Sequence, residues 1–418
     1  MTIEQTLREI GARAKAASTA LQLLTSDEKN AILQAMADEL HEQREIIKRE
    51  NAKDLAFAQN AQLASVLIDR LILDDARIDN MIASIRRIAM LPDPVGKILH
   101  EFEKTNGLLI KKIRTPIGVI AMIYESRPNV TADVSALCLK TSNAVILRGG
   151  KEALQTNQAI LELLLAAGYK TGLPQHAMQL ITIPDHDAVR QLIQMPEYID
   201  LAIPRGGPSL INMVVEHARV PVIKHDKGVC HTFVDKTAQI DMALNICVNA
   251  KCQRPGVCNA MESLLVHEAI ADTFLPRLQM VMAQHHVRLK GDHLSRKILP
   301  MIEEATETDW YTEYYDLILS IKIVKDVSAA IYHINHYGSH HSDAIVSEDL
   351  ASQQLFVNQV DSSAVYINAS TRFTDGGEFG MGAEIGISTD KLHARGPMGL
   401  EELCSYKWVV HGSGQVRE

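Results

Sequence analysis

From residue 117 onward, short apolar runs alternate with segments of helical periodicity, and this alternation restricts the possible folds more than any other feature. The first series of candidate strands is Ile117–Ile123, Ala144–Leu147, Gln179–Thr182, Ile199–Ile203 and Val220–Ile223. The helical segments between them are Thr131–Lys140, Glu152–Ala167, Asp187–Met195 and Pro208–His217. A second series gives strands at Thr232–Val234, Leu264–His267, Ile321–Val324, Asp343–Val346 and Ala364–Tyr366. Strands that alternate with helices form parallel sheets, so we expect two doubly wound α/β domains.

The first 90 or so residues have a different pattern, which predicts helices. Thr25 and Glu28 form a capping-box signature. The apolar residues that follow recur at helical spacing: Ile32, Leu33, Met36 and Leu40. Leu91-Pro92-Asp93-Pro94 ends the helical region, because proline lacks a backbone donor and restricts the residue before it.

The segment from Phe102 to Ile113 alternates apolar and polar residues around Asn106-Gly107, a pair that tolerates the positive φ angles of a tight hairpin turn. An isolated hairpin is marginally stable in water. We therefore expect this arm to pack on another subunit or, alternatively, on its own domain.

Composition excludes several functional classes. The net charge of −9, without a lysine- or arginine-rich block, argues against a nucleic-acid partner. No apolar run approaches the roughly 18 residues that cross a bilayer, and the N-terminus does not resemble a signal peptide, so we expect a cytoplasmic protein. The seventeen histidines include two adjacent pairs, which point apart on regular elements, and we expect no metal site.

The six cysteines form no CxxC pair, so neither a disulfide framework nor a structural zinc site is expected. Most of them fit the role of small buried residues. Cys258 differs, because it follows Pro255-Gly256 on a loop between a helix (Ile240–Ala250) and a strand (Leu264–His267). Loops on a rigid scaffold are the usual place for a nucleophile, and backbone N–H groups beside Cys258 can stabilise an oxyanion.

The sequence around Cys258 resembles the nucleophile motif of the aldehyde dehydrogenase superfamily. Gly256-Val257-Cys258-Asn259-Ala260 and Val266 match, whereas Ser263 stands where arginine is common. Within the superfamily, the chain resembles the γ-glutamyl phosphate reductase family over most of its length. The matching stretches are Tyr124–Thr131, Pro255–Glu262, Val360–Gly377 and Lys391–Gly399.

This resemblance implies an aldehyde-dehydrogenase-like fold and the NADPH-dependent reduction of L-glutamyl 5-phosphate to L-glutamate 5-semialdehyde, a step of proline biosynthesis. The Cys258 thiolate would attack the acyl carbon, phosphate would leave, and hydride would reduce the resulting thioester. It also implies a homo-oligomer and functional coupling to glutamate 5-kinase, which supplies the acyl phosphate. The expected domains are 1–94 with 116–224 for NADP binding, 225–400 for catalysis, and 95–115 with 401–418 as an oligomerisation arm containing a strand near Tyr406–Val410.

One departure from the oxidising relatives is informative. Those enzymes carry a Glu-Leu-Gly-Gly turn whose glutamate activates water to hydrolyse the thioester, and the corresponding stretch here is His225-Asp226-Lys227-Gly228. A water-activating base would waste a thioester destined for reduction, so its absence fits a phosphate-linked reductase. His225 would act either as an acid or base, or as a structural support for its neighbours.

The resemblance also assigns the nucleotide site. Gly380–Gly386 contains a GxGxxG-like string, but its spacing is wrong and it does not open a helix after a strand. Superfamily members instead use a lysine after a strand for the adenosine ribose, and a glutamate three residues later favours NAD. Here Arg148 replaces the lysine and Lys151 replaces the glutamate, and two cations suit a 2′-phosphate. The alternative is that both are solvated loop residues.

Further site residues follow from the local pattern or from the resemblance. Arg205, Gly206 and Gly207 lie at a strand–turn–helix junction that would face the pyrophosphate or the nicotinamide, unless it is a plain turn. Glu313 matches the glutamate that contacts the nicotinamide ribose. The remaining candidates, listed by expected role, are Asn129 or Ser126 as oxyanion donor, with Asn129 preferred, and Arg127, Arg254 and Arg372 as unranked cations for the substrate.

Two other functions fit these features. An enzyme of the same fold could oxidise an aldehyde or reduce a different acyl phosphate, and phosphate dependence with glutamate semialdehyde would separate these cases. A nucleotide-binding scaffold that only regulates a partner kinase would not need an intact Cys258.

Overall fold

A computed structural model describes residues 2–224 and 227–417 of the 418, and the chain divides into two compact units. Unit 1 contains the described residues up to 224, with Gly380–Gly386 and the residues from Met398 onward. Unit 2 contains the described residues from 227 to Phe379, with Ile387–Pro397. Among these residues, no helix is long and apolar enough to cross a membrane. His225 and Asp226, and with them the two roles considered for His225, lie outside the described residues.

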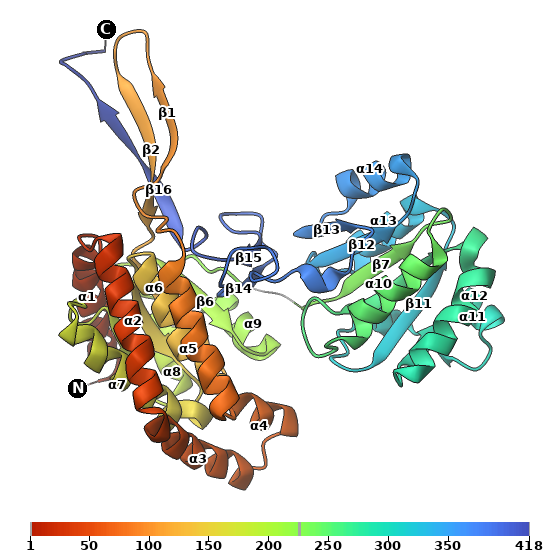
Figure 1. Cartoon of the computed structure of the whole chain (residues 1–418), viewed down its shortest axis with the longest axis horizontal. Coiled ribbons are helices and arrows are strands. Elements are labelled where there is room, and N and C mark those ends of the chain that lie inside the picture. The colour runs from red at the N-terminus through yellow and green to blue at the C-terminus, as the bar shows by residue number, and fades with distance from the viewer. Residues whose placement is uncertain (1, 225–226, 418) are drawn as a thin grey trace. The chain divides into compact units, whose positions relative to one another are not determined.

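Unit 1 is built on a parallel sheet that lies among helices (Figure 1). The strand order of this sheet is β5-β4-β3-β6. Its strands are β3 (Val119–Tyr124), β4 (Ala144–Arg148), β5 (Met178–Leu180) and β6 (Leu201–Arg205). The helices between and after these strands are α6 (Asn129–Lys140), α7 (Leu154–Lys170), α8 (His186–Leu192) and α9 (Pro208–His217). Every residue of β3 and β4 is buried, as expected for a parallel sheet covered on both faces.

The N-terminal region is helical, as predicted. Its helices are α1 (Ile3–Leu21), α2 (Ser26–Glu42), α3 (Arg44–Asn60), α4 (Ser65–Leu71) and α5 (Asp75–Met90). The Thr25 side chain accepts a hydrogen bond from the Glu28 N–H, which completes the predicted capping box. The four apolar residues predicted to face the core of this unit are fully buried: Ile32, Leu33, Met36 and Leu40.

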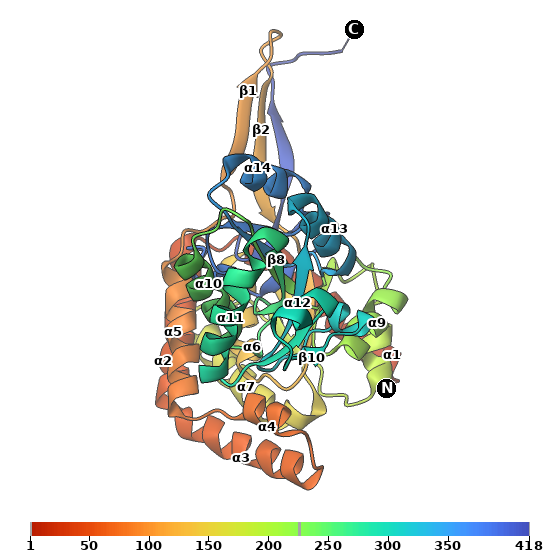
Figure 2. The ribbon, with the colours of Figure 1, turned by 90° about the vertical axis from the view of Figure 1, so that its right-hand side faces the viewer.

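A three-stranded antiparallel sheet extends from unit 1 (Figure 2). It consists of β1 (Ile98–Glu103), β2 (Leu109–Pro116) and β16 (Cys404–His411), with β2 in the centre. The loop at residues 104–108 is longer than the tight turn predicted, and of Asn106 and Gly107 only the glycine has a positive φ, +82°. The side chains of Tyr406, Trp408 and Val410 are about half exposed, so the arm presents an apolar surface.

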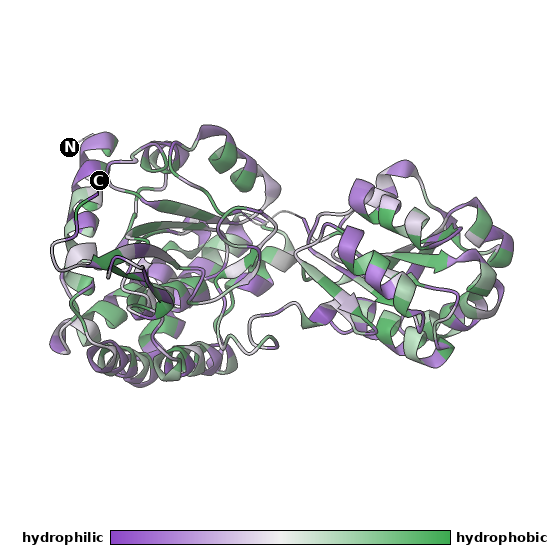
Figure 3. Ribbon diagram, turned by 90° about the horizontal axis from the view of Figure 1, so that it is seen from above, coloured by the Kyte–Doolittle hydropathy of each residue, from purple (hydrophilic) through white to green (hydrophobic). Residues whose placement is uncertain are grey.

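Unit 2 contains a seven-stranded sheet with the order β10-β9-β11-β8-β7-β12-β13, and all its strand pairs are parallel. Its longer strands are β7 (Cys230–Val234), β8 (Met261–His267), β11 (Ile318–Val324), β12 (Ser342–Val346) and β13 (Ala364–Ile367). Its helices are α10 (Ile240–Cys252), α11 (Glu268–Gln284), α12 (His293–Ile298), α13 (Val327–Tyr337) and α14 (Leu350–Gln359). Figure 3 shows hydrophobic residues along the strands and hydrophilic residues on the outer faces of the helices.

The strand predictions were wrong at the sheet margins. Val220–Ile223 is not a strand, because only Val222 forms a bridge, with Ala202. The strands that were missed are β9 (Arg288–Gly291), β10 (Glu303–Glu304), β14 (Gly386–Ser388) and β15 (Gly396–Met398). Each has two to four residues, too few to produce a period-two pattern.

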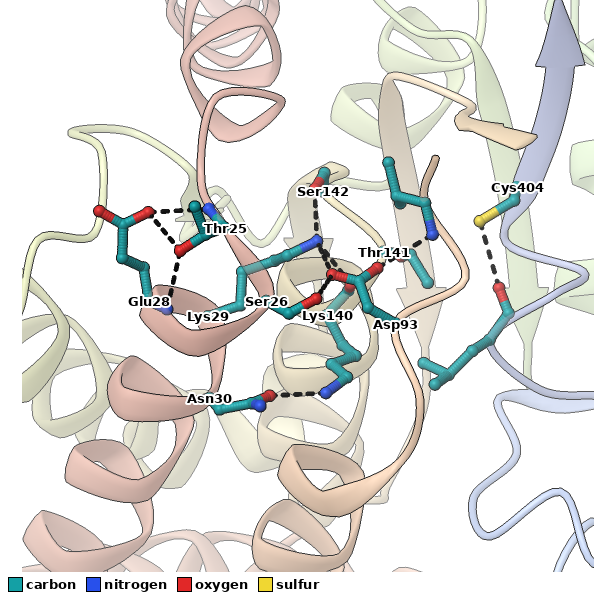
Figure 4. Close-up of polar contacts among 12 residues, drawn as sticks. Thr25, Ser26, Glu28, Lys29, Asn30, Asp93, Lys140, Thr141, Ser142 and Cys404 are labelled. Carbon is teal, nitrogen blue, oxygen red and sulfur yellow. Dashed lines mark hydrogen bonds and ion pairs between the residues drawn. The ribbon is translucent and has the colours of Figure 1, made fainter. Parts of the chain in front are cut away.

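Two lysines are buried inside unit 1 (Figure 4). Lys29 of α2 forms an ion pair with Asp93 and donates hydrogen bonds to the Ser142 hydroxyl and the Lys140 carbonyl. Lys140 itself donates to the Asn30 side chain at 2.6 Å. A buried charge must be paired and hydrogen-bonded, so this cluster fixes helix α2 against the end of α6 and the chain that leads to the arm.

Candidate active site

Cys258 lies on the loop between α10 and β8, and its side chain is half-buried. Four other cysteines are buried: Cys138, Cys230, Cys247 and Cys404. Burial raises the pKa of all four thiols, which keeps them protonated and unreactive. Cys252 is also half-buried, and burial raises its pKa too. Of these two half-buried cysteines, Cys252 is the last residue of α10 and Cys258 lies on the loop that follows.

The backbone around Cys258 is held from several sides. A Cβ atom added to Gly228 would lie 1.9 Å from the Cys258 carbonyl oxygen, so only glycine fits at position 228. The Cys230 thiol donates to the same carbonyl at 3.2 Å, and the Thr371 hydroxyl donates to the Asn259 carbonyl at 2.7 Å. A nucleophile needs this kind of fixed support, because a displacement of about 1 Å lowers the rate strongly.

Two of the three predicted substrate cations lie at this loop. Arg372 donates from Nε to the Gln253 side-chain oxygen at 2.8 Å and from Nη1 to the side-chain oxygen of Asn259, the neighbour of Cys258. Burial, followed by the charge of Arg254, lowers the pKa of the Arg372 guanidinium. Arg254 itself is exposed. Arg127, the third candidate, is half-buried in unit 1.

Glu313 belongs to the surroundings of the same loop. Its side chain is buried, and burial raises the pKa of its carboxyl group. The Tyr315 side chain, the Gly228 backbone and the charge of Lys227 oppose that rise. Glu313 thus lies beside the glycine that contacts Cys258. The predicted nucleophile, Cys258, and the predicted ribose-contacting glutamate therefore share one region of unit 2.

A buried ion pair lies behind this region. Lys251, at the end of α10, contacts Glu262 of β8 with 2.5 Å between Nζ and Oε2, and both side chains are fully buried. Burial raises the pKa of Glu262 to about 8, although the Lys251 charge opposes the shift. The pair joins the two elements that flank the Cys258 loop.

In unit 1, the two predicted cations after β4 differ in their surroundings. Arg148 is buried and donates to the carbonyls of Gly149 and Pro184, each at 3.0 Å. Burial lowers the pKa of its guanidinium. Lys151 is exposed at the start of a short 3-10 helix. The cation that can meet a ligand directly is therefore Lys151, while Arg148 holds the loop.

The glycine turn between β6 and α9 already has hydrogen-bond partners within unit 1. The Gly207 N–H donates to the Glu125 carboxylate at 2.8 Å, and Arg205 donates to the Ile385 carbonyl at 2.6 Å. A Cβ atom added to Gly206 would lie 2.3 Å from the same Glu125 carboxylate. A carboxylate at this helix start repels a pyrophosphate, which favours the nicotinamide end of the cofactor among the two groups considered.

Both candidate oxyanion donors also have partners. The Ser126 N–H and hydroxyl both donate to Glu152, each at 2.8 Å. Asn129 uses one side-chain N–H to reach Asp133 at 3.0 Å. A side-chain amide has two N–H donors, so Asn129 keeps a second donor, whereas the donors of Ser126 are used.

Residues 3–316 match the family model described as "Aldehyde dehydrogenase family", which covers more than half of the chain. The chain belongs to the aldehyde dehydrogenase family. A γ-glutamyl phosphate reductase of Geotalea daltonii is 50% identical over 418 residues, which is 100% of both chains. The crystal structure of the Thermotoga maritima γ-glutamyl phosphate reductase is 45% identical and superposes with a TM-score of 0.97, covering 99% of this chain and 100% of that one. The Saccharomyces cerevisiae enzyme of the same name is 31% identical, with a TM-score of 0.56 and coverage of 99% and 98%.

These comparisons confirm two predictions made from the sequence: the aldehyde dehydrogenase fold class and the resemblance to γ-glutamyl phosphate reductases. The predicted site residues stay predictions. Sequence reasoning missed three features of this family member's site: the fit of Gly228 against Cys258, the Glu125 carboxylate at Gly207, and the Lys251–Glu262 pair. A glycine just before a buried strand is a usable signal for close backbone approach, whereas the partners of buried charges have no signal in a single sequence.

Proposed function

We propose that this protein reduces L-glutamyl 5-phosphate to L-glutamate 5-semialdehyde with release of phosphate, using NADPH and a thioester on Cys258. The family membership and the relative that is 50% identical over the whole chain support this reaction. The observation that carries the proposal is the half-buried Cys258 on a loop fixed by Gly228, Cys230 and Thr371.

The chemistry of the acyl transfer follows from this loop. The Cys258 thiolate forms a bond to the acyl carbon, and the bond between that carbon and the phosphate oxygen breaks. Backbone N–H groups beside Cys258 stabilise the charge that develops on the acyl oxygen. Asn129 is the proposed additional donor, because its side-chain amide keeps one N–H beyond its bond to Asp133.

NADPH, when bound, would supply the hydride that adds to the thioester carbon. The carbon–sulfur bond of the resulting thiohemiacetal then breaks, which releases the aldehyde and restores the Cys258 thiolate. The residues of unit 1 fit a phosphorylated nucleotide at one position, because Lys151 presents an exposed cation directly after β4 and Gly149-Gly150. We assign the 2′-phosphate to Lys151, a supporting role to Arg148, and the turn Arg205-Gly206-Gly207 to the nicotinamide end. Glu313 would contact the nicotinamide ribose.

The remaining assignments extend the same proposal. Residues 1–94 and 116–224 would bind NADPH, residues 225–400 would carry catalysis, and residues 95–115 with 401–418 would form the contacts of a homo-oligomer. The enzyme would act in the cytoplasm, in proline biosynthesis, and would receive its labile substrate from glutamate 5-kinase.

The decisive experiment traps the covalent intermediate. Protein incubated with glutamate semialdehyde and NADP, then digested and mapped, should carry the acyl group on Cys258. The Cys258→Ala variant should form no adduct and lose turnover, because the nucleophile is gone. Cys252→Ala is the matched control, since Cys252 is the other half-buried cysteine of the same region, and it should keep the adduct. An adduct on another cysteine, or full turnover by Cys258→Ala, contradicts the proposal.

A further inference from the structure

Several cations of unit 2 are paired with carboxyl groups. Lys251 pairs with Glu262, and Lys290 pairs with Asp309 at 2.6 Å. Lys391 and Arg395 both pair with Asp361, each at 2.7 Å. In these pairs the cation already has a carboxyl partner and is not open to an anionic ligand.

Arg372 is the exception among the half-buried cations at this loop. Its guanidinium donates to the side-chain oxygens of Gln253 and Asn259, and both acceptors are neutral amides. Within the described residues Arg372 forms no ion pair, although the charge of Asp375 acts on it and partly opposes the lowering of its pKa by burial. Neutral acceptors fix the orientation of a guanidinium without neutralising its charge. Such a group is a prepared site for an anion.

The Asn259 side chain, which accepts a hydrogen bond from Arg372, is itself held in place. The Asn259 side-chain N–H₂ donates to the Thr374 carbonyl at 2.8 Å, which turns its oxygen toward Arg372. Asn259 is buried, and its own carbonyl accepts the Thr371 hydroxyl. Arg372 therefore connects the start of the loop, at Gln253, to the residue that directly follows Cys258. Its remaining terminal nitrogen, Nη2, has no hydrogen bond within the described residues.

Two anionic groups of an acyl phosphate substrate could meet this charge. The phosphate is bonded to the carbon that Cys258 attacks, whereas the α-carboxylate of a glutamyl group is separated from that carbon by three others. A cation held by the neighbour of Cys258 is placed for the group next to the reacting carbon. Arg254, which is exposed at the start of the loop, is the rival for the phosphate.

Building on the proposed function, we propose that Arg372 forms the phosphate subsite of this enzyme. As the sulfur–carbon bond forms and the carbon–oxygen bond breaks, the charge that grows on the leaving phosphate oxygen is stabilised by the guanidinium. In the reverse direction, inorganic phosphate bound there attacks the thioester and displaces the Cys258 thiolate. Charged hydrogen bonds to phosphate oxygens are the interactions that a guanidinium forms best.

The reverse reaction, in which glutamate semialdehyde is oxidised by NADP, separates phosphate binding from thioester formation. Without phosphate, glutamate semialdehyde and NADP should give a single burst of about one NADPH for each Cys258, because the thioester has no acceptor. Adding inorganic phosphate should start steady turnover. The burst amplitude reports Cys258 and the fold of its loop, and the KM for phosphate reports the subsite.

We expect Arg372→Gln to keep the burst amplitude and to raise the KM for inorganic phosphate by about 10- to 100-fold, the range for losing a charged hydrogen bond. Arg372→Lys keeps the charge but loses the planar fork, and it should fall between the wild type and Arg372→Gln. Arg288→Gln is the matched control, because Arg288 is an exposed arginine of unit 2 paired with Glu303, and both readouts should stay unchanged.

Three results would overturn the assignment. The KM for phosphate could stay within twofold in Arg372→Gln, or it could rise in Arg254→Gln in place of Arg372→Gln. The burst could also disappear in both Arg372 variants, which would show that the side chain only holds the loop. Steady turnover of the wild-type enzyme without phosphate would overturn the proposed function itself. This result would be seen with the wild type alone, before any variant is compared, so it is distinct from a failure of the Arg372 assignment.

Discussion

Arg148 and Lys151, three residues apart after strand β4, have opposite surroundings. The guanidinium of Arg148 is buried against the carbonyls of Gly149 and Pro184, while the ammonium of Lys151 is exposed. Arginine suits the first position because its planar fork can donate to two carbonyls at once. An exposed lysine suits the second, where the 2′-phosphate of the proposed cofactor would bind.

The proposed preference for NADPH should therefore depend on Lys151. We expect Lys151→Gln to raise the KM for NADPH by about tenfold, which corresponds to roughly 1.4 kcal/mol, and to leave the KM for NADH nearly unchanged. Steady-state kinetics with both cofactors measures this. Lys170→Gln, a change at an exposed lysine that ends α7, is the control. An equal effect on both cofactors would contradict a contact with the 2′-phosphate.

At the scale of elements, helix α2 is held to its surroundings by charge as well as by apolar packing. Lys29 is 1% exposed and Asp93, which follows helix α5, is 9% exposed. The pair helps to hold both helix–loop segments, and losing either partner is costly because the other charge stays buried.

Removal of one partner should destabilise the protein strongly. We expect Lys29→Met to lower the free energy of unfolding by about 3–5 kcal/mol, since Asp93 would stay buried without its cation. Urea denaturation followed by circular dichroism measures the change. The double variant Lys29→Met/Asp93→Asn should recover part of the loss, because asparagine carries no charge and still offers an acceptor to the Val95 N–H. A double variant less stable than Lys29→Met would refute the explanation.

At the scale of the whole molecule, the three-stranded arm has apolar side chains that the described residues cover only in part. Tyr406, Trp408 and Val410 of β16 are 51%, 52% and 54% exposed. Exposed apolar rows on a paired strand commonly mark a protein interface. The proposed homo-oligomer would cover them.

The double variant Tyr406→Ser/Trp408→Ser should therefore form smaller assemblies than the wild type. Light scattering coupled to size-exclusion chromatography measures the molar mass, and we expect a shift toward the monomer mass of 46.3 kDa. Leu392→Ser removes another exposed apolar side chain, 85% exposed and outside the arm, and should leave the mass unchanged. An unaltered mass for the arm variant would place the subunit contacts elsewhere.

Much of this protein is determined by its sequence alone. The alternation of apolar runs and helices predicted the two parallel sheets, and the Thr25–Glu28 box predicted the start of α2, because both depend on neighbours within a few residues along the chain. The loop position of Cys258 was readable for the same reason. Short strands such as β9 and β10 were not, since a few residues give no periodicity.

Only the tertiary structure decided what the charged residues do. Arg148 against two carbonyls, Glu125 at the Gly207 N–H, and Arg372 between two amides all involve partners that packing brings together. From the sequence alone, Lys29 would be expected on the exposed face of a helix. Its partner Asp93 lies 64 residues later in the chain and reaches it only in the folded protein. Local pattern fixes the elements, whereas the partner and burial of a charge are settled by residues far away in the chain, which no local pattern encodes.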